Sequence, residues 1–139
     1  MARKDAGFTL LEIIFVLIII GVASTMIGSH YASLRVADSQ LERAKVQLIS
    51  AFVQSRNKAL LMGEGLELSI EGNTITHLWG QDKVVLDGVT VKEAKTFKFK
   101  KDGSVNFDTA QDIILEAKDS QASITLSVEP SGYVTEGKR

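Results

Sequence analysis

The sequence predicts an α+β protein in which one long N-terminal helix packs on an antiparallel β domain of two small sheets. An apolar run occupies residues 8–28, and residues 29–62 contain no proline or glycine that would end a helix. From residue 66 to residue 139, apolar residues tend to alternate with polar ones and turn residues are frequent, as is typical of short strands. A chain of 139 residues has room for one such β domain besides the helix.

The apolar run contains one charged residue, Glu12, four positions after Phe8. A run of about 20 apolar residues is long enough to span a bilayer as a helix. A carboxylate near the bilayer centre costs roughly 2.5–3.5 kcal/mol, so an intramembrane glutamate usually has a partner. Cleavage of the chain after Gly7 would create such a partner, because the free α-amino group of Phe8 on a neighbouring chain would lie at a similar depth.

Residues 4–12, with the sequence KDAGFTLLE, resemble the processing site of the type IV prepilin superfamily, which comprises type IV pilins and the pseudopilins of type II secretion. The resemblance implies a pilin-like fold, a cleaved leader at residues 1–7, and cleavage between Gly7 and Phe8 by a membrane prepilin peptidase. It also implies N-methylation of Phe8 and assembly into a filament, in which Glu12 neutralises the N-terminal amine of the adjacent subunit. The implied location is the bacterial inner membrane, with a single transmembrane span and the C-terminal domain in the periplasm.

The implied partners are other pilins or pseudopilins, contacted through the N-terminal helices, together with the prepilin peptidase, an inner-membrane assembly platform and the bilayer. Major pilins and pseudopilins usually carry a proline in the mature helix, whereas Ser29 stands at that place here. This difference favours a minor subunit.

Two other interpretations of the N-terminus stay open. A secretory signal peptide has a shorter apolar region, about 7–15 residues, followed by a cleavage site of small residues, and residues 21–24 at most imitate such a site. A signal anchor fits Arg3 and Lys4, which would hold the N-terminus inside. An anchor does not require Glu12, so the glutamate favours the prepilin interpretation.

The helix is predicted to continue past the membrane and to cover residues 9–61, which gives a length of roughly 75–80 Å. Its second part, residues 29–62, carries leucines at seven-residue intervals, each followed three positions later by an alanine: Leu34, Leu41 and Leu48, with Ala37, Ala44 and Ala51. Such a stripe fits either a coiled-coil homodimer or packing on the chain's own sheet, and the alanines favour the sheet. A second apolar row consists of Val46, Ile49, Val53 and Leu60. It predicts a helix that is apolar on two sides, as expected where a helix packs on a sheet.

The β domain, residues 66–139, is predicted to hold eight or nine short strands, because apolar segments are separated by turn residues such as Asp87-Gly88 and Pro130-Ser131-Gly132. The predicted strands are residues 66–70, 74–79, 83–86, 89–92, 96–100, 104–107, 112–116, 122–128 and 133–135. One of the two sheets is expected to cover the apolar half of the helix.

Three further segments resemble the family of minor pseudopilin H of type II secretion and of its type IV pilus relative FimT. Residues 54–60 resemble the end of the family's helix, where a small residue and an arginine precede an alanine. Residues 99–104 resemble its aromatic-x-x-Asp-Gly-Ser turn, and residues 131–134 resemble its terminal Gly-x-Val strand. The resemblance implies a minor pseudopilin of a type II secretion system. The alternative is a FimT-like minor type IV pilin involved in pilus assembly or DNA uptake.

No catalytic residue, metal site or cofactor site is predicted. The chain has no cysteine, and neither His30 nor His77 has acidic or cysteine neighbours at a metal-binding spacing. Asp102 and Asp108 lie near a glycine turn that could suggest calcium, but an ordinary hairpin turn is the simpler interpretation. A signal-anchored envelope enzyme or binding module is therefore the weakest of the hypotheses.

The charge of the chain argues against a general affinity for nucleic acid, which requires a basic face, because the formal net charge is −1. FimT-like pilins that take up DNA are thought to use basic residues in a mobile C-terminal tail. Here Lys138 and Arg139 end the chain and Glu136 precedes them. A solvated tail is favoured, and nucleic acid is not an expected partner.

Overall fold

The computed structural model describes residues 10–137, without the side chains of residues 25–34. One helix, α1 (Leu10–Met62), has 53 residues and is therefore about 80 Å long. Its C-terminal end, Met62, lies one residue beyond the predicted end, whereas the predicted start at residue 9 lies outside the described residues. The helix ends where Gly63 adopts a positive φ of 64° and donates its N–H to the carbonyl oxygen of Ala59 at 2.9 Å, a common way for glycine to close a helix.

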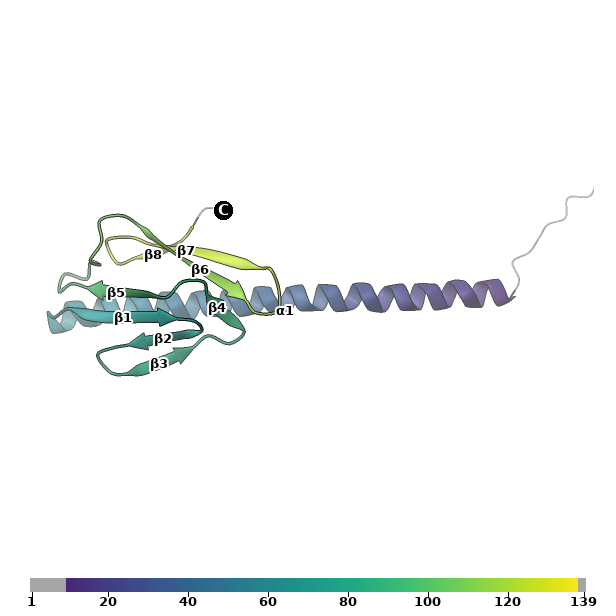
Figure 1. Ribbon diagram of the computed structural model, residues 1–139, viewed down its shortest axis with the longest axis horizontal. Coiled ribbons are helices and arrows are strands. Elements are labelled where there is room, and N and C mark those ends of the chain that lie inside the picture. The colour runs from purple at the N-terminus through teal and green to yellow at the C-terminus, as the bar shows by residue number, and fades with distance from the viewer. Residues whose placement is uncertain (1–9, 138–139) are drawn as a thin grey trace, which may run out of the picture.

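Eight strands follow the helix and form two antiparallel sheets of four strands each, which confirms the predicted α+β architecture. The strands are β1 (Leu66–Glu71), β2 (Thr74–His77), β3 (Asp82–Val85), β4 (Val89–Val91), β5 (Lys95–Phe99), β6 (Gln111–Ala117), β7 (Ser123–Val128) and β8 (Val134–Glu136). The first sheet has the order β3-β2-β1-β5, and the second has the order β4-β6-β7-β8. Figure 1 shows both sheets gathered around the C-terminal half of α1.

The predicted strand at residues 104–107 is wrong, since this segment makes only one isolated bridge, between Phe99 and Val105. The N–H of Val105 donates instead to the carbonyl oxygen of Pro130 at 2.8 Å, in the turn between β7 and β8. The segment still turns back on β5 as predicted, because the N–H of Lys100 donates to the carbonyl oxygen of Ser104 at 2.7 Å and the N–H of Asn106 donates to that of Lys98 at 3.0 Å. It thus pairs briefly with β5 on one side and contacts the second sheet on the other. Asp87-Gly88 likewise links β3 in one sheet to β4 in the other, with Gly88 at a φ of 69°.

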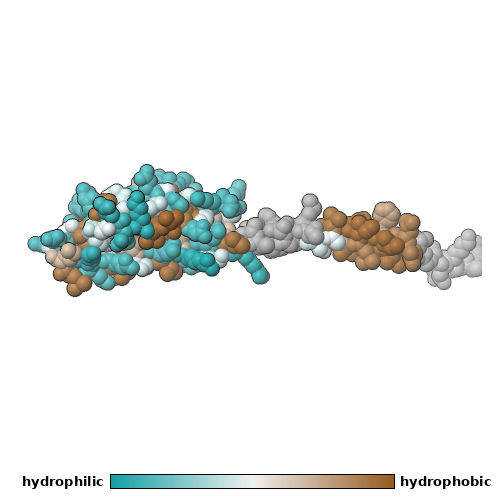
Figure 2. Space-filling model, turned by 90° about the horizontal axis from the view of Figure 1, so that it is seen from below, coloured by the Kyte–Doolittle hydropathy of each residue, from teal (hydrophilic) through white to brown (hydrophobic). Residues whose placement is uncertain are grey.

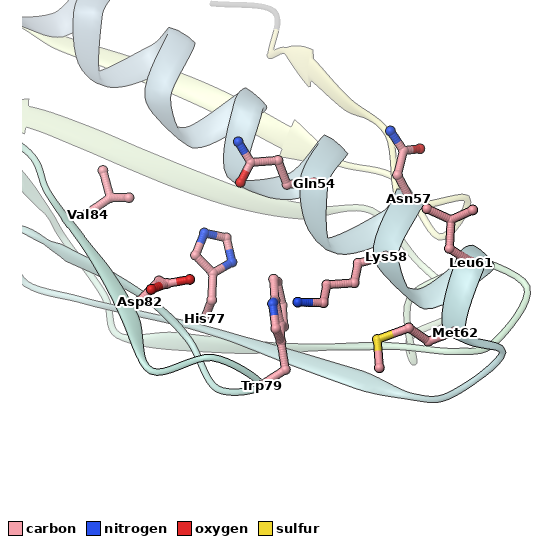
Figure 3. A pocket seen from close by; sticks show the side chains of 9 residues that line it. All are labelled: Gln54, Asn57, Lys58, Leu61, Met62, His77, Trp79, Asp82 and Val84. Atoms are coloured by element: carbon pink, nitrogen blue, oxygen red, sulfur yellow. The ribbon is translucent and has the colours of Figure 1, made fainter.

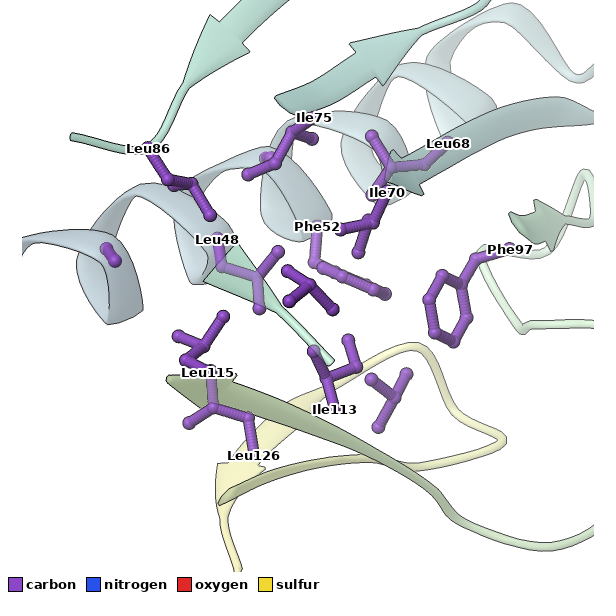
Figure 4. Packing of buried hydrophobic residues seen from close by; sticks show 14 of the residues in the cluster. Leu48, Phe52, Leu68, Ile70, Ile75, Leu86, Phe97, Ile113, Leu115 and Leu126 are labelled. Carbon is purple, nitrogen blue, oxygen red and sulfur yellow. The ribbon is translucent and has the colours of Figure 1, made fainter. Parts of the chain in front are cut away.

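Both sheets pack on α1, so the expectation that a single sheet covers the helix is wrong. Leu48 and Phe52 of α1 lie between Leu68 and Ile75 of the first sheet and Leu115 of the second, as Figure 4 shows. All five side chains are buried. The size of the sheets explains the arrangement. Each sheet has four strands and is too small to enclose a core alone, so both share the apolar surface of the helix.

The stripe of leucines and alanines on α1 faces this core. Its buried members are Ala37, Leu41, Ala44, Leu48 and Ala51. Their burial confirms that these five residues pack on the chain's own sheets and not in a coiled coil, while the side chain of Leu34 lies outside the described set. The second apolar row does not pack in the same way. Val46 is 62% exposed, Val53 46% and Leu60 44%, so this row lies on the outer side of the helix.

Candidate assembly interface

The first part of α1 projects beyond the β domain (Figure 1). Its surface is apolar on the face that Figure 2 shows, and consecutive side chains around the helix are exposed. The exposed residues are Leu10, Leu11, Ile13, Ile14, Phe15, Val16, Leu17, Ile18, Ile19, Ile20 and Val22. A contiguous apolar surface of this kind marks a site that another protein or a lipid phase covers. Gly21 lies within it, and a Cβ added there would meet nothing within 4 Å, so another helix can approach closely at this point.

Glu12 lies in the first turn of α1 and is exposed, within the apolar surface. The other two predicted site residues, Gly7 and Phe8, lie outside the described residues. Within the part of the chain that the structure describes, no helix combines the length and the apolar character needed to cross a membrane. The predicted span, residues 8–28, includes residues outside that part and stays a prediction.

Arg56 joins the three segments that resemble the minor pseudopilin family. Its guanidinium carbon lies 4.3 Å from the centre of the Tyr133 ring, and its Nε donates to the carbonyl oxygen of Ser131 at 3.3 Å. A Cβ built on Gly103 would lie 3.0 Å from Cγ of Arg56, and one built on Gly132 would lie 2.4 Å from the carbonyl oxygen of Gly103. The sequence shows these segments separately. The structure brings the helix end, the turn after β5 and the turn before β8 into one junction.

The Asp102 side chain stabilises the turn between residues 102 and 104. Its Oδ1 accepts hydrogen bonds from the backbone N–H of Ser104 at 2.9 Å and from the Ser104 hydroxyl at 2.6 Å. These bonds hold the pKa of the Asp102 carboxyl below its usual value. The geometry is that of an Asx turn, as the turn interpretation predicts. Among the described residues, no group of three or more histidine, cysteine or acidic side chains is placed to hold a metal ion.

The last strand is held to α1 through Lys45, whose Nζ lies 2.8 Å from Glu42 and 3.3 Å from Glu136. The hydrogen bond to Glu42 is the largest cause of a raised Lys45 pKa. This ion pair joins α1 to the last residue of β8, Glu136. The basic residues Lys138 and Arg139 lie outside the described residues.

His77 occupies a strand, as predicted, but its surroundings were not foreseen. It ends β2, is 4% exposed, and its Nδ1 has no hydrogen-bond partner in the described structure. The Trp79 ring lies 4.5 Å away between ring centres. Burial is the largest cause of a lowered His77 pKa, while Asp82 acts in the opposite direction. The side chain of His30 lies outside the described set.

Comparison with known proteins supports the prepilin interpretation of this geometry. Residues 2–28 match the prokaryotic N-terminal methylation motif. The fold is similar to that of the type IV minor pilin FimU of Pseudomonas aeruginosa in two crystal forms. The chain therefore has a pilin-like fold behind a prepilin-type N-terminal motif. The first FimU structure has a TM-score of 0.59 at 14% identity, and the similarity covers 73% of this chain and 90% of FimU. The second has a TM-score of 0.56 at 14% identity and covers 70% of this chain and 93% of FimU.

The pilin-like fold accounts for the division of the chain into a projecting apolar helix and a β domain packed around its second half. The methylation motif indicates anchoring in the inner membrane. It also indicates two kinds of partner, the prepilin peptidase and pilin-type subunits. No curated protein has a sequence that matches this chain significantly.

Proposed function

We propose that this pilin-like protein is a minor assembly subunit of a filament of the type IV pilus class, specifically the periplasmic pseudopilus of a type II secretion system. The observation that carries the proposal is the exposed apolar first part of α1, which holds one carboxylate, Glu12, ahead of a separately packed β domain. A helix with this surface has to be covered by lipid before assembly and by other helices after it.

Glu12 supplies the polar contact of the proposed assembly. Cleavage between Gly7 and Phe8 frees an α-amino group, and two unit charges about 4 Å apart attract each other by about 4 kcal/mol at an effective dielectric constant of about 20. This energy is comparable with the cost of leaving a carboxylate near the bilayer centre, about 2.5–3.5 kcal/mol. The pairing of Glu12 with the Phe8 amine of a neighbour therefore offsets the cost and sets the axial register between the two helices.

The continuity of α1 supports a minor subunit. The helix runs from Leu10 to Met62 as one element, and the single proline of the chain, Pro130, lies in the turn between β7 and β8. A proline inside a helix would kink it. The proposed subunit therefore keeps a straight connection between its anchor and its β domain.

A minor pilin of a type IV pilus is the second candidate, and the similarity to FimU favours it. The two candidates share cleavage, methylation and membrane anchoring, and they differ in the partners with which the subunit assembles. Partners identified by cross-linking in the membranes of the host bacterium distinguish the two. Secretion-system pseudopilins support the first candidate, whereas pilus subunits support the second.

Two substitutions test the proposed assembly mechanism. We expect Glu12→Ala to leave the mature, methylated N-terminus at Phe8 intact in mass spectra and to reduce incorporation into sheared or cross-linked filaments by at least tenfold. Glu64→Ala, which removes an exposed carboxylate just beyond α1, is the matched control and should assemble normally. Gly7→Glu should instead yield the heavier uncleaved chain. Normal assembly of Glu12→Ala would show that the carboxylate has no role in it.

A further inference from the structure

A groove runs along one side of α1, between the helix and the β2–β3 hairpin. It consists of a cavity of about 630 Å³ near the helix end and a cavity of about 230 Å³ next to it. The two cavities share Gln54, His77 and Val84 as lining residues, so they form one continuous groove. Figure 3 shows the larger cavity, with His77 and Trp79 rising from the hairpin toward the helix.

The imidazole of His77 lines this groove, and its Nδ1 atom is buried beneath the groove surface. A buried polar atom without a partner costs about 1–3 kcal/mol, and such atoms are few in native proteins. The Nδ1 atom of His77 has no partner among the described residues, although the side chain lines both cavities. Because Nδ1 is closed off from solvent, it is a polar atom beneath the groove, and a bound group would reach it only if the imidazole moved.

The outer wall of the groove is β3, an edge strand of the first sheet. The N–H of Leu86 donates to the carbonyl oxygen of Asn73, which marks this opposed pair as hydrogen-bonded. Hydrogen-bonded and non-bonded pairs alternate along an antiparallel ladder. The backbone groups of Lys83 and Val85 therefore point away from β2, toward the open edge, where another strand can pair with them.

The length and the open edge of the groove suit an extended chain. The lining residues on α1 extend from Val46 to Met62, which corresponds to about 24 Å along the helix axis. An extended segment of about seven residues covers this length. Side chains of a strand paired with β3 would fit, because every second one would point into the groove.

The lining of the groove defines the chemistry of the occupant. Apolar surface comes from Val46, Val84, Leu61, Met62 and Trp79, and amides come from Gln47, Gln54 and Asn57. The charged lining residues are Lys58, whose Nζ lies 5.4 Å from the centre of the Trp79 ring, and Asp82. One charge of each sign disfavours nucleic acid, which requires a basic surface. A surface with few charged residues that includes tryptophan and methionine is typical of the centre of a protein interface.

We propose that the groove between α1 and β3 receives an extended segment of a neighbouring filament subunit, which adds a fifth strand to the first sheet and points apolar side chains toward Trp79 and Val84. The proposal rests on the proposed function, which supplies the neighbour. The proposed function makes this chain a minor subunit, so most of its neighbours in the filament are subunits of different sequence.

The test uses a photo-reactive benzophenone amino acid at Val84 of the full chain, in the membranes of the host. We expect a cross-link to a filament subunit other than this chain, with the attachment sites mapped by mass spectrometry to one extended segment. Lys83→Pro removes the N–H that faces the open edge and should reduce the cross-link at least fivefold. Lys83→Ala keeps this N–H and should not reduce the cross-link. Cross-links to lipid, to a helix or to a second copy only, or an equal yield from both Lys83 variants, would overturn the proposal.

Two controls separate failure of the groove from other failures. The same photo-reactive residue at Val16, in the exposed apolar part of α1, reports assembly alone. A cross-link from Val16 without one from Val84 would refute the groove and leave the assembly function standing, whereas no cross-link from either position would refute both. Trp79 is the only tryptophan of the chain, so its emission shows whether Lys83→Pro keeps its fold. Should it unfold, protection of the amides of Lys83 and Val85 from hydrogen exchange on assembly decides the matter in the unmodified chain.

Discussion

Replacement of Gly132 by alanine should destabilise the protein more than the same replacement at a turn glycine that has open space around it. Gly132 lies in the turn between β7 and β8 with a φ of 83°, a conformation that residues with a side chain rarely adopt. An added Cβ would lie 2.4 Å from the carbonyl oxygen of Gly103. Both glycines lie against Arg56, so the turn cannot relax without displacement of the junction between the helix and the two sheets.

The expected loss of stability has two parts. The left-handed conformation costs a non-glycine residue about 1–2 kcal/mol. Relief of the contact requires a backbone shift of about 1 Å, and overpacking of this kind costs about 1–3 kcal/mol. The total, about 2–5 kcal/mol, is a large share of the 5–15 kcal/mol that usually holds a folded protein together.

Gly72→Ala is the matched control, because Gly72 has a φ of 58° but an added Cβ there meets nothing within 4 Å. Only the conformational part of the cost applies to it. Thermal unfolding of the full chain in detergent, followed by circular dichroism, measures both variants. With about 4–8 °C lost per kcal/mol, the overpacking part of about 1–3 kcal/mol should make Gly132→Ala melt at least about 4 °C below Gly72→Ala. Equal melting temperatures would refute the account of the junction.

Two further predictions concern the core and pH. Phe52 makes edge-on contacts with Phe97 at 4.9 Å and with Phe99 at 5.8 Å between ring centres. Phe52→Ala should therefore lower the free energy of unfolding, measured by urea titration, by about 4–5 kcal/mol. Val53→Ala, at an exposed position, should change it by less than about 0.5 kcal/mol. Because burial lowers the His77 pKa more than Asp82 raises it, with Lys58 adding to the lowering, the unfolded state takes up the proton first. The unfolding free energy should thus be independent of His77 above about pH 6.5, decrease as the pH falls below that value, and level off below the lowered pKa. His77→Gln should remove this part of the pH dependence, and an unchanged profile in that variant would contradict the assignment.

Features that depend on local spacing could be predicted from the sequence. The end of α1 follows from Gly63 and Gly65, which stand where the helical pattern stops and the alternation of a strand begins. The turn at Asp102 is predictable for the same reason, because the carboxylate and Ser104 are two residues apart. The buried stripe of Leu41, Ala44 and Leu48 follows from the helical period.

Features that depend on contacts between distant segments could not be predicted in this way. Nothing in the spacing of Arg56, Gly103 and Ser131 shows that they meet, because their proximity depends on the turns of two different sheets. The predicted strand at residues 104–107 fails for the same reason, since Val105 pairs with Pro130 across the junction. The groove at His77 depends on how β2 and β3 extend past the helix, which alternation along a strand does not specify.

The proposed contacts at Glu12 and at the groove are mutually consistent in space. If the Phe8 amine of a neighbour pairs with Glu12, the two helices are offset by four residues, or about 6 Å along the axis. A neighbour with a helix of similar length then holds its β domain at nearly the same height, so the two domains meet side by side and not end to end. The groove between α1 and β3 runs along the side of the domain, with its open edge facing outward. A contact at Glu12 thus brings a neighbour's β domain to the level at which the edge of β3 can be filled.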